Sequence, residues 1–273
     1  MIRTGSVGLD IALGGGWTPG TLNEVWGDPG AGKTTLAKHA AESVVRAHKN
    51  VLWLDLDGSG LYMDNMPGMI VGRPRNAEQA FMMAWHACAE PEIGLVVVDP
   101  AHLLIRQREI EGDPEYVPHP QREYRVELNE LKDAARCGDT TVLFLSRPRD
   151  HERQPVRGTG ISEKVLYRVH VHPDVVHQDG SREIQVTVKN TADKVVQHDA
   201  ARYVINPGTG IDQAEELVWT AVRLGVIQRR ASWLFYGQVK AHGVKDFADM
   251  VRQPGSRYPY LLDNDIRKMA GIS

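Results

Sequence analysis

Residues 27–34 decide the fold of this chain, and they read Gly27-Asp28-Pro29-Gly30-Ala31-Gly32-Lys33-Thr34. The stretch fills every fixed position of the pattern G-x-x-x-x-G-K-[ST]. Its glycines allow the backbone to curl so that successive amide N–H groups point inward at phosphate oxygens. In such a loop the lysine reaches the β- and γ-phosphates and the hydroxyl group binds Mg²⁺. The pattern therefore predicts a phosphate-binding loop with Lys33 and Thr34 in these two roles.

The segments on either side of the loop supply the context that the pattern requires. Residues 21–26 read as a strand. Apolar residues then recur every four positions, as expected for one face of a helix that opens at about Lys33. They are Leu36, Ala40 and Val44, and beside them Ala37, Ala41 and Val45. A strand before the loop and a helix after it favour a nucleotide site over the alternative, a glycine-rich turn that happens to carry Lys-Thr.

Further short apolar runs alternate with helical stretches along the first two thirds of the chain. Residues 51–54, 95–98 and 142–145 are aliphatic or aromatic and suit strands buried on both faces of a parallel sheet. Residues 77–89 and 124–136 read as the helices between them. Strand, helix and strand in series predict an α/β fold with a mostly parallel central sheet.

The pattern changes after about Gly160. Residues 167–172 and 183–188 alternate between apolar and polar, with a turn at 178–181, and predict an antiparallel hairpin at the sheet edge. Residues 206–210 read as a linker. We therefore predict an ATPase-type core over residues 1–210 and a small, mostly helical C-terminal domain over 211–273. Five aromatic residues are available for the core of that domain: Trp219, Trp233, Tyr236, Phe247 and Tyr260.

Composition sets limits on the class of protein. The chain has 273 residues, a net charge of −3 and 42% hydrophobic residues, so a sizeable core is expected and any nucleic-acid site must be a local patch. Its two cysteines, Cys88 and Cys137, read as packing residues of a reducing compartment. With neither a signal peptide nor a membrane-length apolar run, we expect a soluble cytoplasmic protein without a membrane partner.

Acidic residues follow two of the expected strands. Asp99 ends the run 95–98, where a carboxylate holds the Mg²⁺ shell in P-loop NTPases; the alternative is an Asp that caps the next helix. Asp55 and Asp57 follow the run 51–54, and either can orient or deprotonate an attacking water. The alternative for Asp57 is turn chemistry around Gly58.

Four arginines lie in the segment 147–160, which follows a strand: Arg147, Arg149, Arg153 and Arg157. Their guanidinium groups suit the phosphates of a nucleic-acid backbone. The alternative is a solvated loop, because Asp150, Glu152 and Glu163 dilute the charge. His170, His172 and His177 have no carboxylate or cysteine pattern that completes a metal site, so we interpret them as exposed strand residues.

Several stretches resemble the RecA family of bacterial recombinases, in order and over nearly the whole chain. Residues 3–16 resemble the segment that leads into the family's phosphate-binding loop, and residues 21–35 continue the match. Residues 109–112 resemble the opening of its first DNA-binding loop, 188–190 a late strand with an ATP-contacting lysine, and 231–236 a motif of its C-terminal domain.

The resemblance implies an ATP- and Mg²⁺-dependent protein that exchanges or anneals DNA strands, with ATP between neighbouring subunits. Gly27 to Thr35 would hold the triphosphate, Asp99 the Mg²⁺ side, and Lys189 would reach across the subunit interface. Asp57 falls on the family's catalytic glutamate, and Arg147 falls on a glutamine that senses the γ-phosphate. Single-stranded DNA, with duplex DNA as a further partner, would bind the loops 106–119 and 148–160. The DNA-binding residues implied there are Arg106, Arg108, Arg149, Arg153, Arg157, Gly158 and Gly160.

The chain also departs from the family. Asp57 and Arg147 leave the hydrolysis rate and the coupling of ATP to DNA open, and Thr191 replaces a second cross-subunit lysine. The family's N-terminal helix and filament-linking strand have no counterpart before Met1, so we expect a ring, a different filament or DNA-dependent assembly. Compact cores of this sort resemble those encoded by bacteriophages, whose proteins work in the host cytoplasm.

Four hypotheses remain at this point. The first is a DNA-dependent ATPase of homologous recombination. The second is a nucleotide-gated single-strand annealing protein with little hydrolysis. The third is a ring-shaped, helicase-like motor, and the fourth is an ATPase that does not act on DNA.

Overall fold

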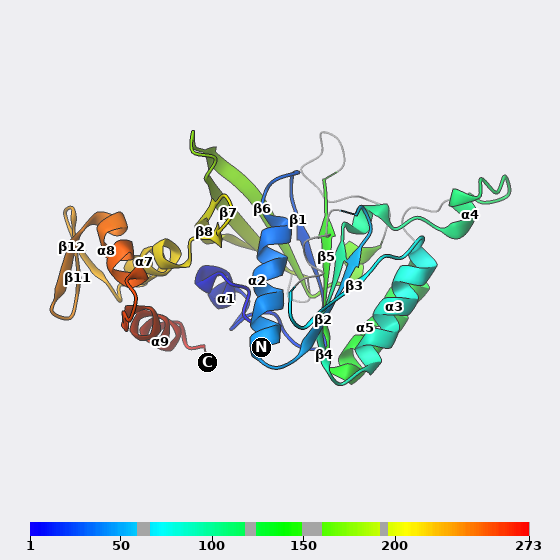
Figure 1. Cartoon of the computed structure of the whole chain (residues 1–273), viewed down its shortest axis with the longest axis horizontal. Coiled ribbons are helices and arrows are strands. Elements are labelled where there is room, and N and C mark those ends of the chain that lie inside the picture. The colour runs from blue at the N-terminus through cyan, green and yellow to red at the C-terminus, as the bar shows by residue number, and fades with distance from the viewer. Residues whose placement is uncertain (59–65, 118–123, 149–159, 192–195, 273) are drawn as a thin grey trace.

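The computed structural model describes residues 1–58, 66–117, 124–148, 160–191 and 196–272. In this part of the chain a nine-stranded sheet is flanked by helices on both faces, and a small unit of helices and strands lies at one end (Figure 1). The strand order in the large sheet is β3-β2-β4-β5-β1-β6-β7-β8-β9. The predicted α/β fold is confirmed.

The first six strands in this order are parallel. They are β3 (Met69–Gly72), β2 (Asn50–Asp55), β4 (Ile93–Asp99), β5 (Thr141–Ser146), β1 (Leu22–Trp26) and β6 (Tyr167–Val176). Every residue of β4 and β5 is buried, as continuous apolar runs require. The carboxyl ends of these strands therefore meet at one edge of the sheet, where α/β proteins bind ligands.

The remaining strands are antiparallel: β7 (Arg182–Asn190), β8 (Val196–Asn206) and β9 (Gly210–Ile211). The predicted hairpin is confirmed as β6 and β7, and the sheet continues beyond it through β8 to the short edge strand β9. The interpretation of 206–210 as a linker is wrong. Asn206 pairs with Gly210, so these residues form the tight turn between β8 and β9.

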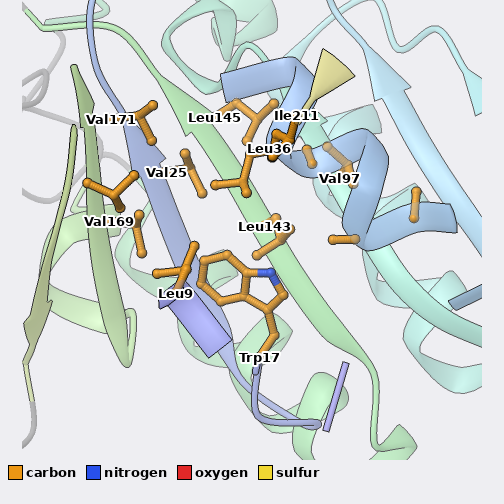
Figure 2. Packing of buried hydrophobic residues seen from close by; sticks show 14 of the residues in the cluster. Leu9, Trp17, Val25, Leu36, Val97, Leu143, Leu145, Val169, Val171 and Ile211 are labelled. Atoms are coloured by element: carbon orange, nitrogen blue, oxygen red, sulfur yellow. The ribbon is translucent and has the colours of Figure 1, made fainter. Parts of the chain in front are cut away.

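Two hydrophobic clusters cover the two faces of the sheet. On one face α1 (Val7–Ala12) and α2 (Lys33–Arg46) pack against β1, β5 and β6. Figure 2 shows Leu9, Trp17, Leu36 and Leu143 in this cluster, together with Ile211 from β9. On the other face, α3 (Ala77–Ala89), α5 (Arg125–Gly138) and α6 (Ile161–Lys164) pack on the sheet. Between β4 and α5 lie the 3-10 helix η2 (Ala101–Leu103) and α4 (Gln107–Ile110).

The C-terminal unit contains α7 (Gln213–Arg223), α8 (Gly243–Arg252) and α9 (Tyr258–Ala270). It also contains a three-stranded antiparallel sheet of β10 (Gln228–Arg230), β11 (Trp233–Tyr236) and β12 (Val239–His242). Phe247 is fully buried in its core, but Trp219, Trp233 and Tyr260 are exposed, so these three aromatic residues are not core residues as we had expected.

Buried polar contacts join the C-terminal unit to α1. Arg267 Nη2 on α9 donates to Asp10 Oδ2 at 2.7 Å. Glu216 on α7 accepts hydrogen bonds from Ser6 Oγ at 2.5 Å and from the Gly8 amide at 3.0 Å. These groups border a cavity of about 550 Å³. The unit is therefore attached through specific charged and polar contacts as well as through apolar packing.

The two cysteines have different surroundings. Cys88 is buried in α3, and burial raises the pKa of its thiol to about 12. Cys137 on α5 is exposed, so it is not the packing residue that we expected. None of the helices in the described ranges combines the length and hydropathy needed to span a bilayer.

Candidate nucleotide-binding site

The phosphate-binding loop connects β1 to α2, as the sequence predicts. Gly27 has a φ of 156°, and a Cβ there would lie 2.0 Å from the carbonyl oxygen of Val171 on β6. Gly32 caps α2 in the left-handed region with a φ of 91°, and a Cβ there would meet the Ile205 side chain at 2.2 Å. Both positions therefore require glycine for conformation and for space.

Lys33, the first residue of α2, lies across the loop. Its ammonium group donates to the carbonyl oxygens of Gly27 and Asp28, both at 2.8 Å. Burial, and after it the nearby Arg147 charge, lowers the pKa of Lys33 to about 8. An anion in the loop would favour the charged form of this group. The lysine and its cradle therefore fit a phosphate ligand.

Thr34 and Asp99 bring the loop and β4 into contact. Thr34 Oγ1 donates to Asp99 Oδ2 at 3.1 Å. Burial raises the pKa of Asp99 to about 6, with a further contribution from the negative charges of Asp57 and Asp55. A hydroxyl and a carboxylate oxygen are hard ligands of the kind that Mg²⁺ accepts. The pair therefore fits the predicted role at the metal side of the nucleotide.

Asp57 and Arg147 lie at the ends of two other parallel strands. Asp57 follows β2 and Arg147 follows β5, and Arg147 Nη2 is 3.9 Å from Asp57 Oδ2. Asp55, the last residue of β2, is buried and faces the Arg73 guanidinium at 3.5 Å. Its Oδ2 atom makes no hydrogen bond. The structure thus gathers the predicted residues Lys33, Thr34, Asp57, Asp99 and Arg147 at one edge of the sheet.

A cavity of about 310 Å³ opens over the loop. Its walls include residues that the sequence analysis missed, because they come from the β6–β7 turn and from the end of β8. Arg182 donates to the carbonyl oxygen of Gly30. The lining residues are Gly30, Gly32, Lys33, Thr34, Thr35, Gly180, Arg182, Ile205 and Pro207. No sequence motif marks Arg182 or Pro207, since only the sheet order brings them to the loop.

His102 is a second residue without a sequence signal. It lies on η2 after Asp99, half-buried, and its Nδ1 atom is buried without a hydrogen-bond partner. Burial, and then the positive charge of Arg147, lowers the pKa of its imidazole, while Asp57 acts in the opposite direction. These surroundings therefore favour the uncharged form of His102.

Lys189 lies away from the loop of its own chain. It is exposed on β7 and pairs with Arg168 of β6, which in turn pairs with Glu24 of β1. Trp26 lies two residues beyond Glu24 on β1 and pairs with His170 of β6. The phosphate-binding loop begins directly after Trp26. The strand register therefore places Lys189 at the end of β7 away from the loop of its own chain.

The implied DNA-binding arginines of the first loop are already ion-paired. Arg106 Nη1 lies 2.5 Å from Glu127 and 3.5 Å from Glu78, and its guanidinium covers the ring of Tyr124. Arg108 Nη2 lies 2.6 Å from Asp113. Of the second loop, Gly160 caps α6 with a φ of 70°. Arg149, Arg153, Arg157 and Gly158 lie outside the described residues.

The histidines of β6 pack rather than project freely. His170 is half-buried and stacks on Trp26, with ring centroids 3.8 Å apart, and His172 is half-buried beside it. His177 is exposed but follows the end of β6, so the interpretation as exposed strand residues fails on burial for His170 and His172 and on position for His177. Within the described ranges no three His, Cys, Asp or Glu side chains form a metal-binding group.

A family model described as the RecA N-terminal domain matches residues 1–151, more than half of the chain. The chain belongs to the RecA family. It is 31% identical over 258 residues to Protein RecA of Caulobacter vibrioides, across 86% of this chain and 72% of that protein. Protein RecA of Acidothermus cellulolyticus is 28% identical over 277 residues, across 93% and 79% of the two chains.

A solved structure described as the RadB recombinase shares the fold with a TM-score of 0.56 and 21% identity. It is matched over 77% of this chain and 98% of its own. The predicted family and fold are therefore confirmed. Family membership supports a nucleotide-binding ATPase with a role in DNA recombination or repair.

Proposed function

We propose that this RecA-family protein is a DNA-dependent ATPase that acts on single-stranded DNA in homologous recombination, by strand exchange or annealing. The observation that carries the proposal is the contact between the phosphate-binding loop and β4. Thr34 and Asp99 meet at 3.1 Å, next to a lysine held inside the loop. The contact supports the proposal because it brings a hydroxyl, a carboxylate and an ammonium group together at the carboxyl edge of a parallel sheet, where α/β proteins bind ligands.

Each residue of the site has a role in the proposed reaction. The amides of Gly27 to Thr35 and the ammonium group of Lys33 bind the triphosphate. Thr34 and Asp99 hold Mg²⁺, which when bound neutralises phosphate charge. Asp57 orients the attacking water and accepts its proton. Arg147 contacts the γ-phosphate, because a guanidinium group is a strong bidentate partner of phosphate.

The proposed DNA contacts come from the loops 106–119 and 148–160. The net charge of −3 gives no general attraction to nucleic acid, so local arginines must supply it. Arg106 and Arg108 would have to exchange their carboxylate partners for phosphates. Contacts of this kind bind the backbone, so affinity should depend on salt and little on sequence.

The first experiment measures ATP turnover with and without single-stranded DNA. We expect DNA to stimulate turnover in the wild type, and Lys33→Ala to abolish nucleotide binding and turnover together. Lys38→Ala is the matched control, since Lys38 lies on the same helix but does not line the cavity over the loop. A nucleotide that binds Lys33→Ala as tightly as the wild type would contradict the proposed site. An absence of stimulation by any DNA would contradict the proposed activity.

We also propose that ATP binds between subunits of a homo-oligomer, because the strand register places Lys189 at the end of β7 away from the loop of its own chain. Lys33→Ala and Lys189→Ala should each be inactive alone and should recover activity when mixed. In a head-to-tail assembly about one quarter of the mixed interfaces would join an intact loop to an intact Lys189. Mass measurement with an ATP analogue checks assembly directly. Mixtures without any recovery, from variants that still assemble, would contradict the shared site.

A second candidate function is a nucleotide-gated annealing protein with little hydrolysis. The short side chain of Asp57 and its ion pair with Arg147 favour this candidate. It predicts tight binding of ATP and DNA with negligible turnover. The turnover measurement above separates the two functions.

A further inference from the structure

The two departures from the family's catalytic residues face each other in this chain. The resemblance places a glutamate at position 57 and a glutamine at position 147, and a neutral glutamine forms no ion pair. Here a carboxylate and a guanidinium group lie 3.9 Å apart. In the sheet β4 separates β2 from β5, so the pair reaches across the end of β4, where Asp99 lies.

The charges of this pair act on the groups that hold the nucleotide. The Arg147 charge lowers the pKa of Lys33, in addition to the larger effect of burial. The Asp57 charge raises the pKa of Asp99, again after burial. Both members of the pair are therefore close enough to the phosphate and metal positions to respond to a charged ligand.

We propose that Asp57 and Arg147 form an exchangeable ion pair that makes the site specific for a nucleotide with a γ-phosphate. Arg147 leaves Asp57 when a γ-phosphate is present, and Asp57 then becomes available to the attacking water. With a diphosphate, Arg147 stays on Asp57 and the carboxylate remains engaged. This inference rests on the proposed nucleotide site, which it deepens by naming the determinant of triphosphate specificity.

The geometry of the pair suits exchange. At 3.9 Å the two groups are near the limit of ion-pair contact, and the Arg147 side chain is 45% exposed against 26% for Asp57. Ion pairs of this exposed type are weak, because water and salt screen them. A phosphate group carries more charge than a carboxylate and accepts two parallel hydrogen bonds from a guanidinium group. Arg147 therefore gains on moving from Asp57 to a phosphate beside Lys33.

The test is a double-mutant cycle on nucleotide affinity. The affinities of ADP and of a non-hydrolysable ATP analogue are measured for the wild type, Asp57→Asn, Arg147→Gln and the double variant. Asp57→Asn should tighten the analogue by about 3- to 10-fold, because Arg147 no longer has a competing partner. Arg147→Gln should weaken the analogue by about 10-fold. Both variants should change the affinity for ADP by less than about twofold.

The decisive comparison is Asp57→Asn in the Arg147→Gln background. The proposal expects most of the gain in analogue affinity to disappear there, since no guanidinium remains to be released. An equal gain in both backgrounds would overturn it, because simple repulsion between Asp57 and phosphate would then explain the effect. An equal gain for ADP and the analogue would overturn it as well.

Arg73→Gln is the matched control. Arg73 pairs with the neighbouring carboxylate of Asp55 at 3.5 Å and is similarly exposed, at 44%. Removal of Arg73 should leave the ratio of the affinities for the analogue and for ADP unchanged. A fall in analogue affinity as large as that of Arg147→Gln would contradict a specific role for Arg147. Thermal unfolding checks that each variant folds. Arg147→Lys keeps the positive charge but loses the planar guanidinium group, so its affinity for the analogue should lie between those of the wild type and Arg147→Gln. If the wild type binds nucleotide but the effects of Asp57→Asn and Arg147→Gln are independent, this inference alone is rejected. If Lys33→Ala binds nucleotide as tightly as the wild type, the proposed site itself is rejected.

Discussion

Asp57 has one methylene group fewer than the glutamate that the RecA family places at this position. Its carboxylate lies two residues after β2, 3.9 Å from the Arg147 guanidinium group. A general base must come within hydrogen-bond reach of the proton that it accepts. Under the proposed function we therefore expect side-chain length at this position to limit the rate of hydrolysis.

Asp57→Glu tests this consequence. The longer side chain should raise kcat by about 10-fold, because it extends the carboxylate toward the attacking water without changing its charge. The KM for ATP should stay within about twofold, since the phosphate contacts are unchanged. Steady-state kinetics with single-stranded DNA present gives both values. A kcat that is unchanged or lower would show that reach does not limit turnover.

At this scale the sequence predicted the residues that lie together along the chain or directly follow a buried strand. Lys33 and Thr34 belong to one contiguous motif, and Asp99 follows a run of aliphatic residues that could only be a buried strand. Arg182, Pro207 and His102 could not be found in this way. Arg182 and Pro207 reach the loop only because β7 and β8 fold back alongside it, and His102 occurs in no motif.

The junction of α7 with α1 places a carboxyl group in the interior. Glu216 is 2% exposed and accepts hydrogen bonds from Ser6 and Gly8, and burial raises its pKa to about 8. The ordinary value is 4.5, so between these two values the folded protein binds a proton that the unfolded chain has released. The stability contributed by this group is complete below pH 4.5 and is lost as the pH rises toward 8.

Glu216→Gln isolates this effect, because glutamine keeps an acceptor for Ser6 and Gly8 but does not titrate. The two proteins should be similarly stable near pH 5, and the variant should become the more stable one as the pH rises. The difference should grow by at most about 1.4 kcal/mol per pH unit. Denaturant unfolding at several pH values measures it. Parallel stability curves for the two proteins would mean that Glu216 titrates normally in the folded state.

Among the strands, those buried on both faces of the sheet were predictable from the sequence, and the short exposed strands of the C-terminal unit were not. The strands β2, β4 and β5 form continuous apolar runs, so their type and position followed from the sequence. The strands β10 and β11 escaped prediction, because all three residues of β10 are exposed and Trp233 begins β11 at the surface. The turn 206–210 was read as a linker, since proline and glycine mark a tight hairpin turn and a linker equally well.

At the scale of the whole molecule, the C-terminal unit meets the large sheet's α1 through a junction that combines polar contacts with apolar packing. The C-terminal core around Phe247 is separate from the clusters that flank the large sheet. However, the Arg267–Asp10 ion pair and the Glu216 hydrogen bonds lie buried between the units. Separating the units would break these contacts and would also expose the apolar side chains of Val7 and Ile11, which pack on the C-terminal cluster. We therefore expect the division at residue 210 to mark two packing units that unfold together.

Phe247→Ala tests this expectation. Removing a fully buried phenylalanine should cost about 3 to 5 kcal/mol, which lowers the Tm by about 10 °C in a chain of this size. Calorimetry should show one transition, and an ATP analogue should raise its temperature in the wild type and in the variant. Tyr260→Ala is the control, since that side chain is 75% exposed in the same unit and its loss should change little. Two separate transitions, with only one shifted by the analogue, would show independent domains.

The close approach of Gly27 to the carbonyl of Val171 ties the nucleotide loop to the adjoining strand. A Cβ at position 27 would lie 2.0 Å from that oxygen, so the contact leaves no room for a side chain. β6 pairs with β7 along most of its length, and β7 contains Lys189. A methyl group added at position 27 would therefore press the loop against β6 and disturb the strand ladder that leads to Lys189.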